Sequence, residues 1–461
     1  MKNVGQRTFD GIYYNMFDFD KIKSVYMIGI GGASMQNLAL LSQKLGLEVS
    51  GSDRSYSDVL ERLKSHGIRV VVGSDCEEVE RADLVVYSSA VGQDDTERTY
   101  ALNVGKMEIE RKEYLGALSK LFDRVVSIGG SHGKSTMSAM VAWVLARVGA
   151  DITTHLGCKP IGCEGFVYAD KRDIFVCEAC EYRRSFLELD SYIGVITAVD
   201  YDHPDTYPTR QDLLRAFEEF GQKSQILIMS EQAKSQLKLP CVSYGMSEDC
   251  DYFARKIRQN RGKYRCQVVH DGQSVNLNLN VYGKHNLLNA LGAVAVCNTL
   301  GYDLAEIVKF LEGFCGIERR FECKGKMKSG ARIVVDYAHH PTEIEAAINT
   351  ASQMTKGKIW TIFQPHTYSR TAKLMDEFVD SFYWSDEIIL LPTFSAREEE
   401  KDGKNSWELY QKLLDSGQIC IYAQDMQSVA DGVRNMTGSD DIVLVLGAGD
   451  VNKMAEMLMD D

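Results

Sequence analysis

Short apolar runs alternate with segments of helical periodicity along most of the chain. After each run, apolar residues recur every three or four positions, as they do on the buried face of a helix. Strands that alternate with helices in this way indicate a parallel sheet. The first series has strands near residues 24–32, 48–53 and 83–91, and its first helix carries Met35, Leu38, Leu41 and Leu45 on one stripe.

The same pattern begins again twice. The second series has strands near residues 124–130, 173–180, 192–200 and 225–230, a helix over 285–301, and an alternating segment over 264–283. That segment predicts a β-hairpin that turns at Asp271 and Gly272. The third series has strands near residues 331–341, 357–366, 386–394, 418–423 and 441–451. We therefore predict three domains, at residues 1–112, 113–318 and 319–461.

Composition and charge narrow the class of protein. The 461 residues exceed what one hydrophobic core usually serves, and 44% hydrophobic and 25% charged content is ordinary for a globular chain. A formal net charge of −13 disfavours a nucleic-acid partner, since such a binder needs a basic face. The apolar runs are shorter than the roughly 20 residues that span a bilayer, and the first residues carry no apolar signal core. We expect a cytoplasmic protein without a nucleic-acid or membrane partner.

The twelve cysteines are more typical of free thiols than of disulfides in such a chain. Cys177 and Cys180 have CxxC spacing, and Cys158 and Cys163 are the other candidates for a zinc site. The second pair has the wrong spacing for zinc, and Cys177 continues an apolar strand. We therefore favour a structural interpretation of these thiols.

The glycines after the first strand form the first candidate ligand loop. Gly29, Gly31 and Gly32 would let backbone amides approach a pyrophosphate at a helix N-terminus. Asp53 ends the next strand, at the usual position of a ribose contact. Because Ser34 stands where a dinucleotide fingerprint has its third glycine, a plain tight turn and an NAD site are the alternatives.

The stretch SIGGSHGKSTMSAM, at residues 127–140, suggests a phosphate-binding loop of unusual form. The standard pattern places a glycine five residues before its Gly-Lys pair, where this chain has Ile128. Lys134 would reach the β- and γ-phosphates of a nucleotide, and Ser135 would place its hydroxyl on magnesium. The alternative is a glycine-rich turn that precedes an unrelated lysine.

Acidic and imidazole groups at neighbouring strand ends favour the nucleotide site. Glu178 ends one predicted strand, and Asp200, Asp202 and His203 follow the next. Because the carboxyl ends of parallel strands share one edge of a sheet, these groups would face the loop. His203 alone is more typical of a structural histidine, but the combination indicates a nucleotide–magnesium site.

Polar residues later in the chain add to this site. Asn286 and Asn289 share a helix face and could contact an adenine edge, with a helix N-cap at Asn286 as the alternative. In the last third, polar and charged residues follow strands or mark the domain junction, and cations at a strand end suit a carboxylate or phosphate. These residues are Arg319, Arg320, Asp336, His339, His340, His366 and Arg370. A solvated loop is the alternative for each.

Eight ordered motifs together resemble the Mur ligase family. They are GIGGASM, GSHGKST, EACE, DHPDTY, GKHNLLNA, ERRFE, DYAHHPTE and FQPHTYSRT, and they cover nearly the whole chain. The family's loop has the short form G-x-x-G-K-[ST], here Gly130 to Ser135. The resemblance implies an α/β fold of three domains: an N-terminal Rossmann-like domain for the UDP-sugar, a central P-loop ATPase-type mixed sheet for ATP, and a C-terminal Rossmann-like domain that closes over it.

The resemblance also implies a reaction. ATP would drive the joining of L-alanine to the lactyl carboxylate of UDP-N-acetylmuramate through an acyl phosphate, with ADP and phosphate as products. The step belongs to peptidoglycan synthesis, and so to cell wall biogenesis, cell shape and cell division. ATP and Mg²⁺ are the implied cofactors, and the implied assembly is a monomer or homodimer.

Family roles carry over position by position. The implied catalytic residues are Lys134, Glu178, His203, His339 and Arg370. The implied magnesium ligands are Ser135, Glu178 and His203. The implied nucleotide contacts are Gly130, Ser131, His132, Gly133, Lys134, Ser135, Thr136, Asn286, Asn289, Arg320 and Asp336. The implied UDP-sugar contacts are Gly29, Gly31, Gly32, Ser34, Asp53, Ser88 and Ser89.

The chain departs from the family pattern where substrates rather than ATP are selected. Gln36 and Asn37 replace the last two residues of the first loop, and Thr367 stands where some relatives have arginine. Arg183 and Arg184 stand where many relatives are polar or acidic. Three other functions are left open: a peptide-adding ligase of cell-wall recycling, an NAD-dependent oxidoreductase, and a non-catalytic protein derived from a ligase.

Overall fold

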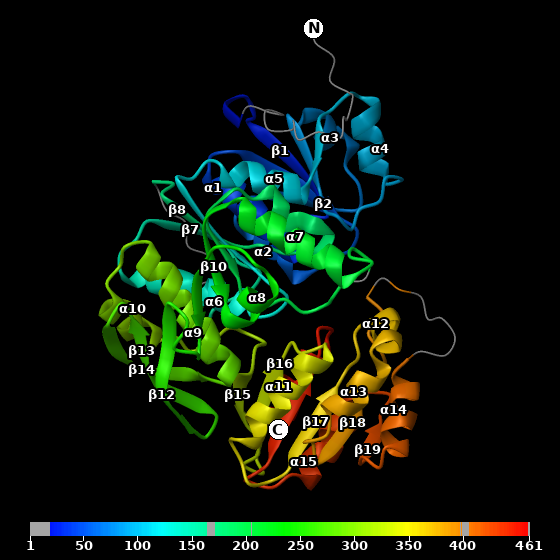
Figure 1. Ribbon diagram of the computed structural model, residues 1–461. Helices are drawn as coiled ribbons and strands as arrows, with labels where there is room; N and C mark the ends of the chain where they lie inside the picture. Colours follow the sequence, from blue (N-terminus) through cyan, green and yellow to red (C-terminus); the bar gives the residue numbers. More distant parts are fainter. Residues whose placement is uncertain (1–18, 164–170, 204, 397, 399–404, 460–461) are drawn as a thin grey trace. The chain divides into compact units, whose positions relative to one another are not determined.

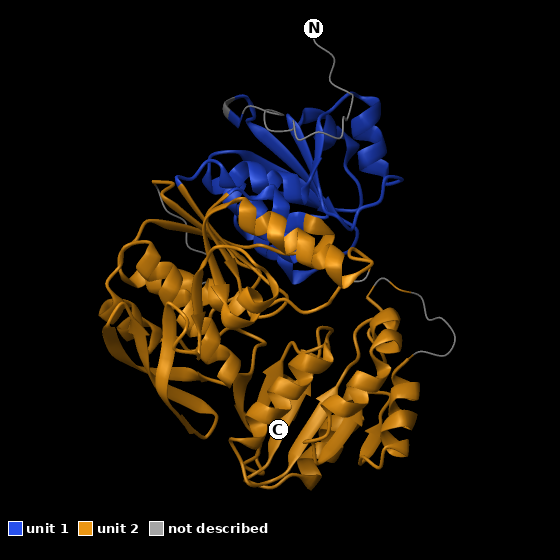
Figure 2. Cartoon of the chain, in the orientation of Figure 1, with its two compact units in different colours: residues 1–123, 185–190 blue, residues 124–184, 191–461 orange. Residues whose placement is uncertain are grey.

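The computed structural model describes residues 19–163, 171–203, 205–396, 398 and 405–459 (Figure 1). The chain divides into two compact units, residues 1–123 with 185–190 and residues 124–184 with 191–461 (Figure 2). Residue 112, the predicted first boundary, lies in helix α5 (Arg111–Ser119), and the first segment of the first unit extends to Asp123. Its helices and strands alternate as expected, and the predicted α/β class is confirmed.

The first unit is built on a parallel sheet with strand order β3-β2-β1-β4-β5. This is the order of a Rossmann-like sheet, in which the first strand lies at the centre. The strands are β1 (Ser24–Ile28), β2 (Glu48–Asp53), β3 (Arg69–Val72), β4 (Leu84–Tyr87) and β5 (Glu108–Glu110). The helices are η1 (Phe19–Lys21), α1 (Ala33–Lys44), α2 (Asp58–Ser65), α3 (Cys76–Arg81), α4 (Thr96–Asn103) and α5 (Arg111–Ser119).

The second unit contains a mixed sheet with strand order β14-β13-β12-β11-β10-β9-β6-β8-β7. Its parallel strands are β6 (Arg124–Gly129), β7 (Ile152–His155), β8 (Ile174–Glu178), β9 (Ser191–Ile196), β10 (Ser224–Ser230) and β11 (Val242–Gly245). Strand β12 (Tyr252–Asn260) continues them, and β13 (Lys263–His270) and β14 (Gln273–Tyr282) run antiparallel to their neighbours. The last two form the predicted hairpin, with positive φ angles at Asp271 and Gly272.

Helices cover both faces of the parallel part of this sheet. Helices α6 (Lys134–Arg147), α9 (Lys284–Thr299) and α10 (Leu304–Leu311) share one core with Ile193 and Val195 of β9. Helix α7 (Arg210–Gln222) packs on β9 and β10 from the other side, where Phe220 lies beside Gly194. The remaining helices are α8 (Glu231–Gln236) and η2 (Tyr182–Glu188). Burial on both faces explains why β6, β8 and β9 are almost continuously apolar.

The second unit also contains a sheet with strand order β15-β16-β20-β17-β18-β19. Strand β15 (Glu322–Lys326) is antiparallel, and β16 (Arg332–Asp336), β17 (Ile359–Phe363), β18 (Glu387–Leu390), β19 (Cys420–Tyr422) and β20 (Ile442–Leu446) are parallel. One face packs on α11 (Pro341–Ser352), α13 (Met375–Ser381) and α14 (Ser406–Asp415), and the other on α15 (Met426–Met436) and α16 (Met454–Met459). Short helices α12 (Tyr368–Lys373) and η3 (Val451–Lys453) follow strand ends.

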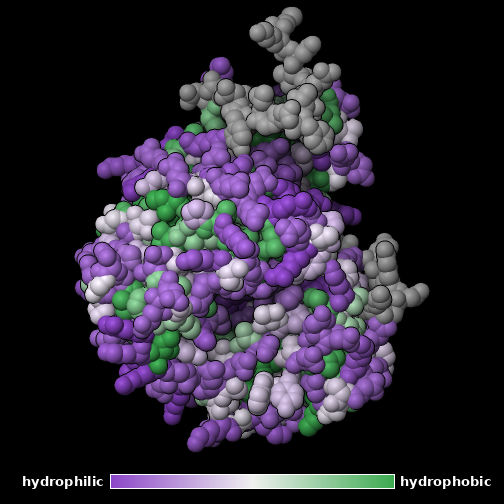
Figure 3. Space-filling view, in the orientation of Figure 1, coloured by the Kyte–Doolittle hydropathy of each residue, from purple (hydrophilic) through white to green (hydrophobic). Residues whose placement is uncertain are grey.

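The surface of the view in Figure 3 is mostly hydrophilic, with scattered apolar residues. In the described part of the chain, no helix combines the length and apolar character needed to cross a membrane.

Candidate active site

The phosphate-loop turn between β6 and α6 has two positions that require glycine. Gly133 caps α6 with a φ of 85°, and a Cβ there would lie 2.5 Å from Asn289 Oδ1. A Cβ on Gly130, whose φ is 129°, would lie 2.1 Å from Thr197 Oγ1. A side chain at either position would meet both a clash and an unfavourable backbone conformation. The loop is therefore a turn whose conformation requires glycine, and it lies at a helix N-terminus, where backbone amides can bind phosphate.

Lys134 lies at the centre of this loop and contacts a buried carboxylate. Its Nζ lies 2.9 Å from Glu181 Oε2, and the Glu181 side chain is only 3% exposed. Glu181 Oε1 lies 3.5 Å from His203 Nε2, so one carboxylate contacts two of the predicted catalytic side chains. Burial alone would lower the pKa of Lys134, but the acidic groups around it, Glu181 foremost, together outweigh burial and raise this pKa. The ammonium and the carboxylate are thus both charged.

Ser135 and Glu178 lie together at the predicted metal position. Ser135 Oγ donates to Glu178 Oε2 at 2.9 Å, and the Gly157 amide donates to Glu178 Oε1 at 2.7 Å. His203 lies 3.5 Å from Glu181 and 3.6 Å from Asp202, and the magnesium-binding role of Ser135, Glu178 and His203 stays a prediction. Among the described residues, no group of three or more His, Cys, Asp or Glu side chains is arranged to hold a metal ion. A hydroxyl and a carboxylate still fit Mg²⁺, which usually takes few protein oxygens and completes its shell with phosphates and water.

The cysteines near this region are free thiols. Cys177 is buried in β8, where its Sγ lies 3.6 Å from Ser127 Oγ, and burial raises the pKa of the thiol to about 12. Cys158 Sγ donates to the Ser135 carbonyl at 3.4 Å. These contacts agree with the structural interpretation of the thiols.

A cavity of about 250 Å³ opens beside the loop. It is lined by Ser131, His132, Gly133, Lys134, Ser135, Thr136, Thr197, Ala198, Tyr244, His285, Asn286, Leu288, Asn289, Arg320, Asp336, Thr342, Glu343, Ala346 and Ala347. The set joins the phosphate loop and α9 to residues of α11 and the segment before β15. Ten of the predicted nucleotide contacts, all but Gly130, therefore line one cavity.

The two asparagines of α9 lie on one face, as predicted. Asn289 Nδ2 donates to Asn286 Oδ1 at 3.1 Å, and Asn286 Nδ2 donates to the Tyr282 carbonyl at 2.8 Å. The alternative that Asn286 is the helix N-cap is wrong, because α9 begins at Lys284 and Gly283 is the cap. Beside them, burial and Arg320 lower the pKa of His285 to about 4, so its imidazole is neutral.

Glu343, in the first turn of α11, connects the phosphate loop with residues of the third sheet. Its carboxylate oxygens lie 3.4 Å from His132 Nδ1, 3.4 Å from His339 Nδ1 and 3.6 Å from Arg320 Nη1. Burial would raise the pKa of Glu343, but these groups together hold it well below the usual value. The carboxylate is therefore ionised.

Asp336 shows the opposite shift. Burial raises its pKa to about 6 despite Arg320 nearby, although its oxygens accept the amides of Phe321 and Ala338. This carboxyl, which ends β16, shares the cavity with Glu343 and Arg320.

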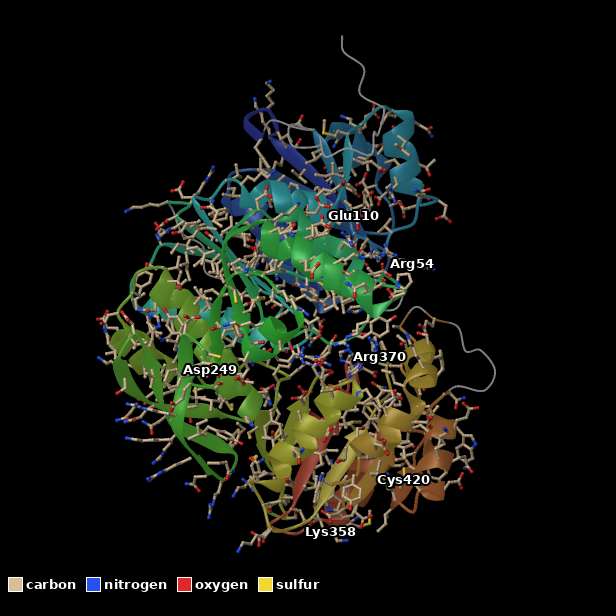
Figure 4. The ribbon with its side chains drawn as sticks, viewed as in Figure 1. Arg54, Glu110, Asp249, Lys358, Arg370 and Cys420 are labelled. Atoms are coloured by element: carbon tan, nitrogen blue, oxygen red, sulfur yellow. The ribbon has the colours of Figure 1, made fainter. Side chains whose placement is uncertain are left out.

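His339 and Arg370 approach each other through His366. The rings of His339 and His366 lie 5.9 Å apart, and Arg370 Nη1 lies 3.3 Å from His366 Nδ1. Burial, together with His339 and Arg370, lowers the pKa of His366 to about 4. Thr367 precedes α12 with a φ of 68°, and its amide donates to the Phe394 carbonyl. Figure 4 shows Arg370 at one end of the third sheet.

The backbone amides of the glycine loop in the first unit donate hydrogen bonds to nearby groups of the same unit. The Gly31 amide donates to Asp53 Oδ2 at 2.9 Å, and the Gly29 amide donates to the Ser52 carbonyl at 2.8 Å. The Gly32 amide donates to the Gly29 carbonyl. Asp53 thus fixes the loop, and its predicted contact to a ribose stays a prediction.

The other predicted sugar-binding residues surround this loop. Ser34 Oγ accepts from Arg111 Nη1 at 3.1 Å, and Ser88 Cβ lies 3.1 Å from the position of a Cβ on Gly29. Ser89 follows on the loop after β4. Of the two departures on α1, Gln36 accepts from Arg62 and Asn37 is buried, so Gln36 is the one whose side chain reaches the surface.

Comparisons with known proteins show the family to which this chain belongs. Three family models match consecutive parts of the chain: "Mur ligase family, catalytic domain" at residues 24–123, "Mur ligase middle domain" at 128–297 and "Mur ligase, glutamate ligase domain" at 319–449. A UDP-N-acetylmuramate–L-alanine ligase of Acetivibrio thermocellus is 35% identical over 97% of this chain and 98% of its own. That of Clostridium acetobutylicum is 37% identical over 95% and 98%. The chain belongs to the Mur ligase family.

Solved structures of Mur ligases have the same fold. A UDP-N-acetylmuramate–alanine ligase of Thermotoga maritima aligns with a TM-score of 0.81 at 25% identity, covering 94% of this chain and 98% of its own. A murein peptide ligase of Psychrobacter arcticus aligns with a TM-score of 0.68 at 20% identity, over 95% and 98%. Membership in this ligase family removes the NAD-dependent oxidoreductase from consideration.

Two residues of this Mur ligase site were not assigned roles from the sequence. Glu181 and Glu343 both stand inside quoted motifs, EACE and DYAHHPTE. A second acid three residues after Glu178, and an acid four residues after His339, were the available signals. Neither signal shows which side chain the acid contacts. Lys134, for example, lies 47 residues from Glu181 in sequence.

We expect Glu181→Gln to lower the rate of phosphate release about ten- to a hundredfold, because the neutral amide no longer positions Lys134 and His203. It also leaves a buried ammonium without its anion, so the free variant should melt at a lower temperature. ATP supplies a replacement anion and should raise the melting temperature of the variant more than that of the wild type. Thermal denaturation with and without ATP checks this. The control is Glu219→Gln, because the side chain of Glu219 is 46% exposed and pairs with Arg184 at the surface. Equal stabilisation of both proteins by ATP would contradict it.

Proposed function

We propose that this Mur ligase joins L-alanine to the lactyl carboxylate of UDP-N-acetylmuramate with ATP and Mg²⁺. The relatives from Acetivibrio thermocellus and Clostridium acetobutylicum are named UDP-N-acetylmuramate–L-alanine ligases. Identities of 35% and 37% with those relatives, over nearly the full length of the chain, support this choice of substrates. The observation that carries the chemistry is the phosphate loop, whose Lys134 and Ser135 contact the carboxylates of Glu181 and Glu178. Such a site suits phosphoryl transfer followed by amide formation in peptidoglycan synthesis.

The residues of the second unit would act mainly by binding and alignment. A carboxylate that attacks a phosphoryl group brings two anions together, so catalysis depends on positive charge and position. Lys134 and Arg320 line the cavity and supply fixed cations there. Mg²⁺, when bound at Ser135 and Glu178, would neutralise phosphate charge. Asn286 and Asn289 would contact the base of the nucleotide.

The amino acid would bind near the third sheet. Arg370 is a cation suited to the carboxylate of the incoming amino acid, and His366, held neutral by its low pKa, keeps a lone pair beside it. Thr367 neighbours both groups and would affect selectivity for the amino acid. We propose that the reaction takes place in the cytoplasm and serves cell wall biogenesis, and with it cell shape and cell division. Residues 1–112, 113–318 and 319–461 would be the sugar, ATP and amino-acid domains.

The proposed function is tested by measuring which acceptor, a single amino acid or a peptide, the protein uses. The protein is mixed with ATP, Mg²⁺ and UDP-N-acetylmuramate, and phosphate release is followed with L-alanine, glycine, L-serine or a tripeptide. We expect release with L-alanine that depends on the UDP-sugar, and no release with the tripeptide. Dependence on the tripeptide would instead assign the chain to peptide-adding enzymes, and ATP binding without release for any acceptor would indicate a non-catalytic protein.

A further inference from the structure

Strands β12 and β13 carry an unusual concentration of positive charge. Residues 255–265 contain six lysines and arginines, whereas the chain as a whole has a formal net charge of −13. They are Arg255, Lys256, Arg258, Arg261, Lys263 and Arg265, which we call the basic face. All are exposed except Lys263, which is partly buried. Long side chains that end in nitrogen extend from this part of the second unit in Figure 4, and its surface is predominantly hydrophilic in Figure 3.

The strand register places three of these arginines on the same side of the sheet. Arg258 lies directly opposite Arg265, and Arg255 lies opposite Gln267. The neighbours of Arg265 along β13, Tyr264 and Cys266, are buried, so Arg265 and its partner point outward. Like charges directly opposite each other destabilise a sheet. The pairing of two arginines therefore costs folding free energy.

No contact within the described chain offsets this cost. In that part of the molecule no ion pair involves any residue of the basic face. Arg255 donates to Gln267, and Lys263 lies 5.1 Å above the Tyr282 ring. The carboxylate of Glu312 accepts from the backbone and side-chain amides of Asn278, opposite Arg265. An anion from outside the chain would supply the missing charge.

We propose that the basic face binds the headgroups of an anionic lipid surface. Arg255, Arg258 and Arg265 lie on one side of two adjacent strands and so form a plane, which matches a bilayer surface. The plane consists of cations and amides, including Asn276, Asn278 and Asn280 of β14, and Ile257, 37% exposed, adds an apolar group at its margin. Single-stranded nucleic acids are usually bound through exposed aromatic rings. The aromatic side chain at this margin, Tyr282, packs against Phe321 with ring centroids 5.8 Å apart.

The net negative charge of the chain does not prevent this binding. At physiological ionic strength, charges more than about 8 Å from the surface are largely screened, so the local face dominates. Each basic residue near an anionic surface adds a similar increment to binding. A membrane-spanning segment is unnecessary, because the face would lie on the headgroups.

The test uses the full chain and vesicles of phosphatidylcholine, with or without phosphatidylglycerol. We expect co-sedimentation with the anionic vesicles alone, and loss of binding at high salt. The triple variant Arg255→Gln, Arg258→Gln, Arg265→Gln should bind about a hundredfold more weakly. The control Lys44→Gln, Lys64→Gln, Arg81→Gln removes the same charge from exposed positions of the first unit and should bind like the wild type. Phosphate release should be unchanged in both variants, which shows that they fold.

Three results would overturn the proposal. They are absence of binding by the wild type, equal loss in the two triple variants, and tighter binding to single-stranded RNA than to anionic vesicles at the same salt concentration. The last result would assign the face to nucleic acid.

Discussion

Lys134→Ala is expected to lower the rate of phosphate release at least about a thousandfold while leaving the affinity for UDP-N-acetylmuramate nearly unchanged. The loss is large because Lys134 is the cation of the phosphate loop, and removing a preorganised charge at the reacting group typically costs this much. Sugar binding should survive because the predicted sugar contacts belong to the first unit, whereas Lys134 belongs to the second. Phosphate release measures the first quantity, and titration calorimetry with the UDP-sugar measures the second.

The matched control is Lys358→Ala. Lys358 is exposed and paired with Glu387 at the far end of β17 from the predicted amino-acid site, so its loss should change neither quantity. Loss of sugar binding in a folded Lys134→Ala protein would contradict the division of roles between the two units. A rate close to that of the wild type would contradict the role of the loop itself.

Much of the fold follows from local pattern. Strands such as β6, β9 and β20 are buried on both faces and have continuous apolar runs, so they were predictable without knowledge of their partners. Strand β12 was not predicted, because residues 255–260 are exposed and mostly polar and carry no strand periodicity. It forms because β11 and β13 pair with it on either side. Tertiary pairing there overrides the local signal.

The site was predictable to the extent that its residues follow strands. Lys134, Ser135 and Glu178 lie at neighbouring strand ends, and the parallel topology brings them together as expected. The role of Glu181 depends on its burial between Lys134 and His203, which only the folded chain shows. Asn286 illustrates a smaller error: its side chain does bond to a nearby carbonyl, but the helix starts three residues earlier than the N-cap interpretation required.

Glu343→Gln is expected to destabilise the second unit by about 3 kcal/mol, because it removes the anion shared by His132, His339 and Arg320. The side chain is only 17% exposed, so water replaces little of the lost interaction. The same change should lower phosphate release, since His132 and Arg320 line the cavity beside the phosphate loop, where we propose that ATP binds. Chemical denaturation of the variant measures the free energy of unfolding. Glu345→Gln, an exposed neighbour on α11, is the control and should stay within about 0.5 kcal/mol of the wild type.

The effect of Glu343→Gln should depend on pH in a defined direction. The folded pKa of Glu343 lies well below its ordinary value of 4.5. A depressed carboxyl pKa contributes stability above the unfolded pKa, and this contribution is lost as the pH falls through the folded pKa. The difference between wild type and variant should therefore shrink below about pH 4.5. It should also fall as the pH rises through the pKa of His132, which Glu343 raises. His132 and Arg320, which contact Glu343, come from different elements. If the stability difference between wild type and variant did not shrink at the lowest pH at which the wild type folds, the Glu343 carboxylate would not be what holds these groups together.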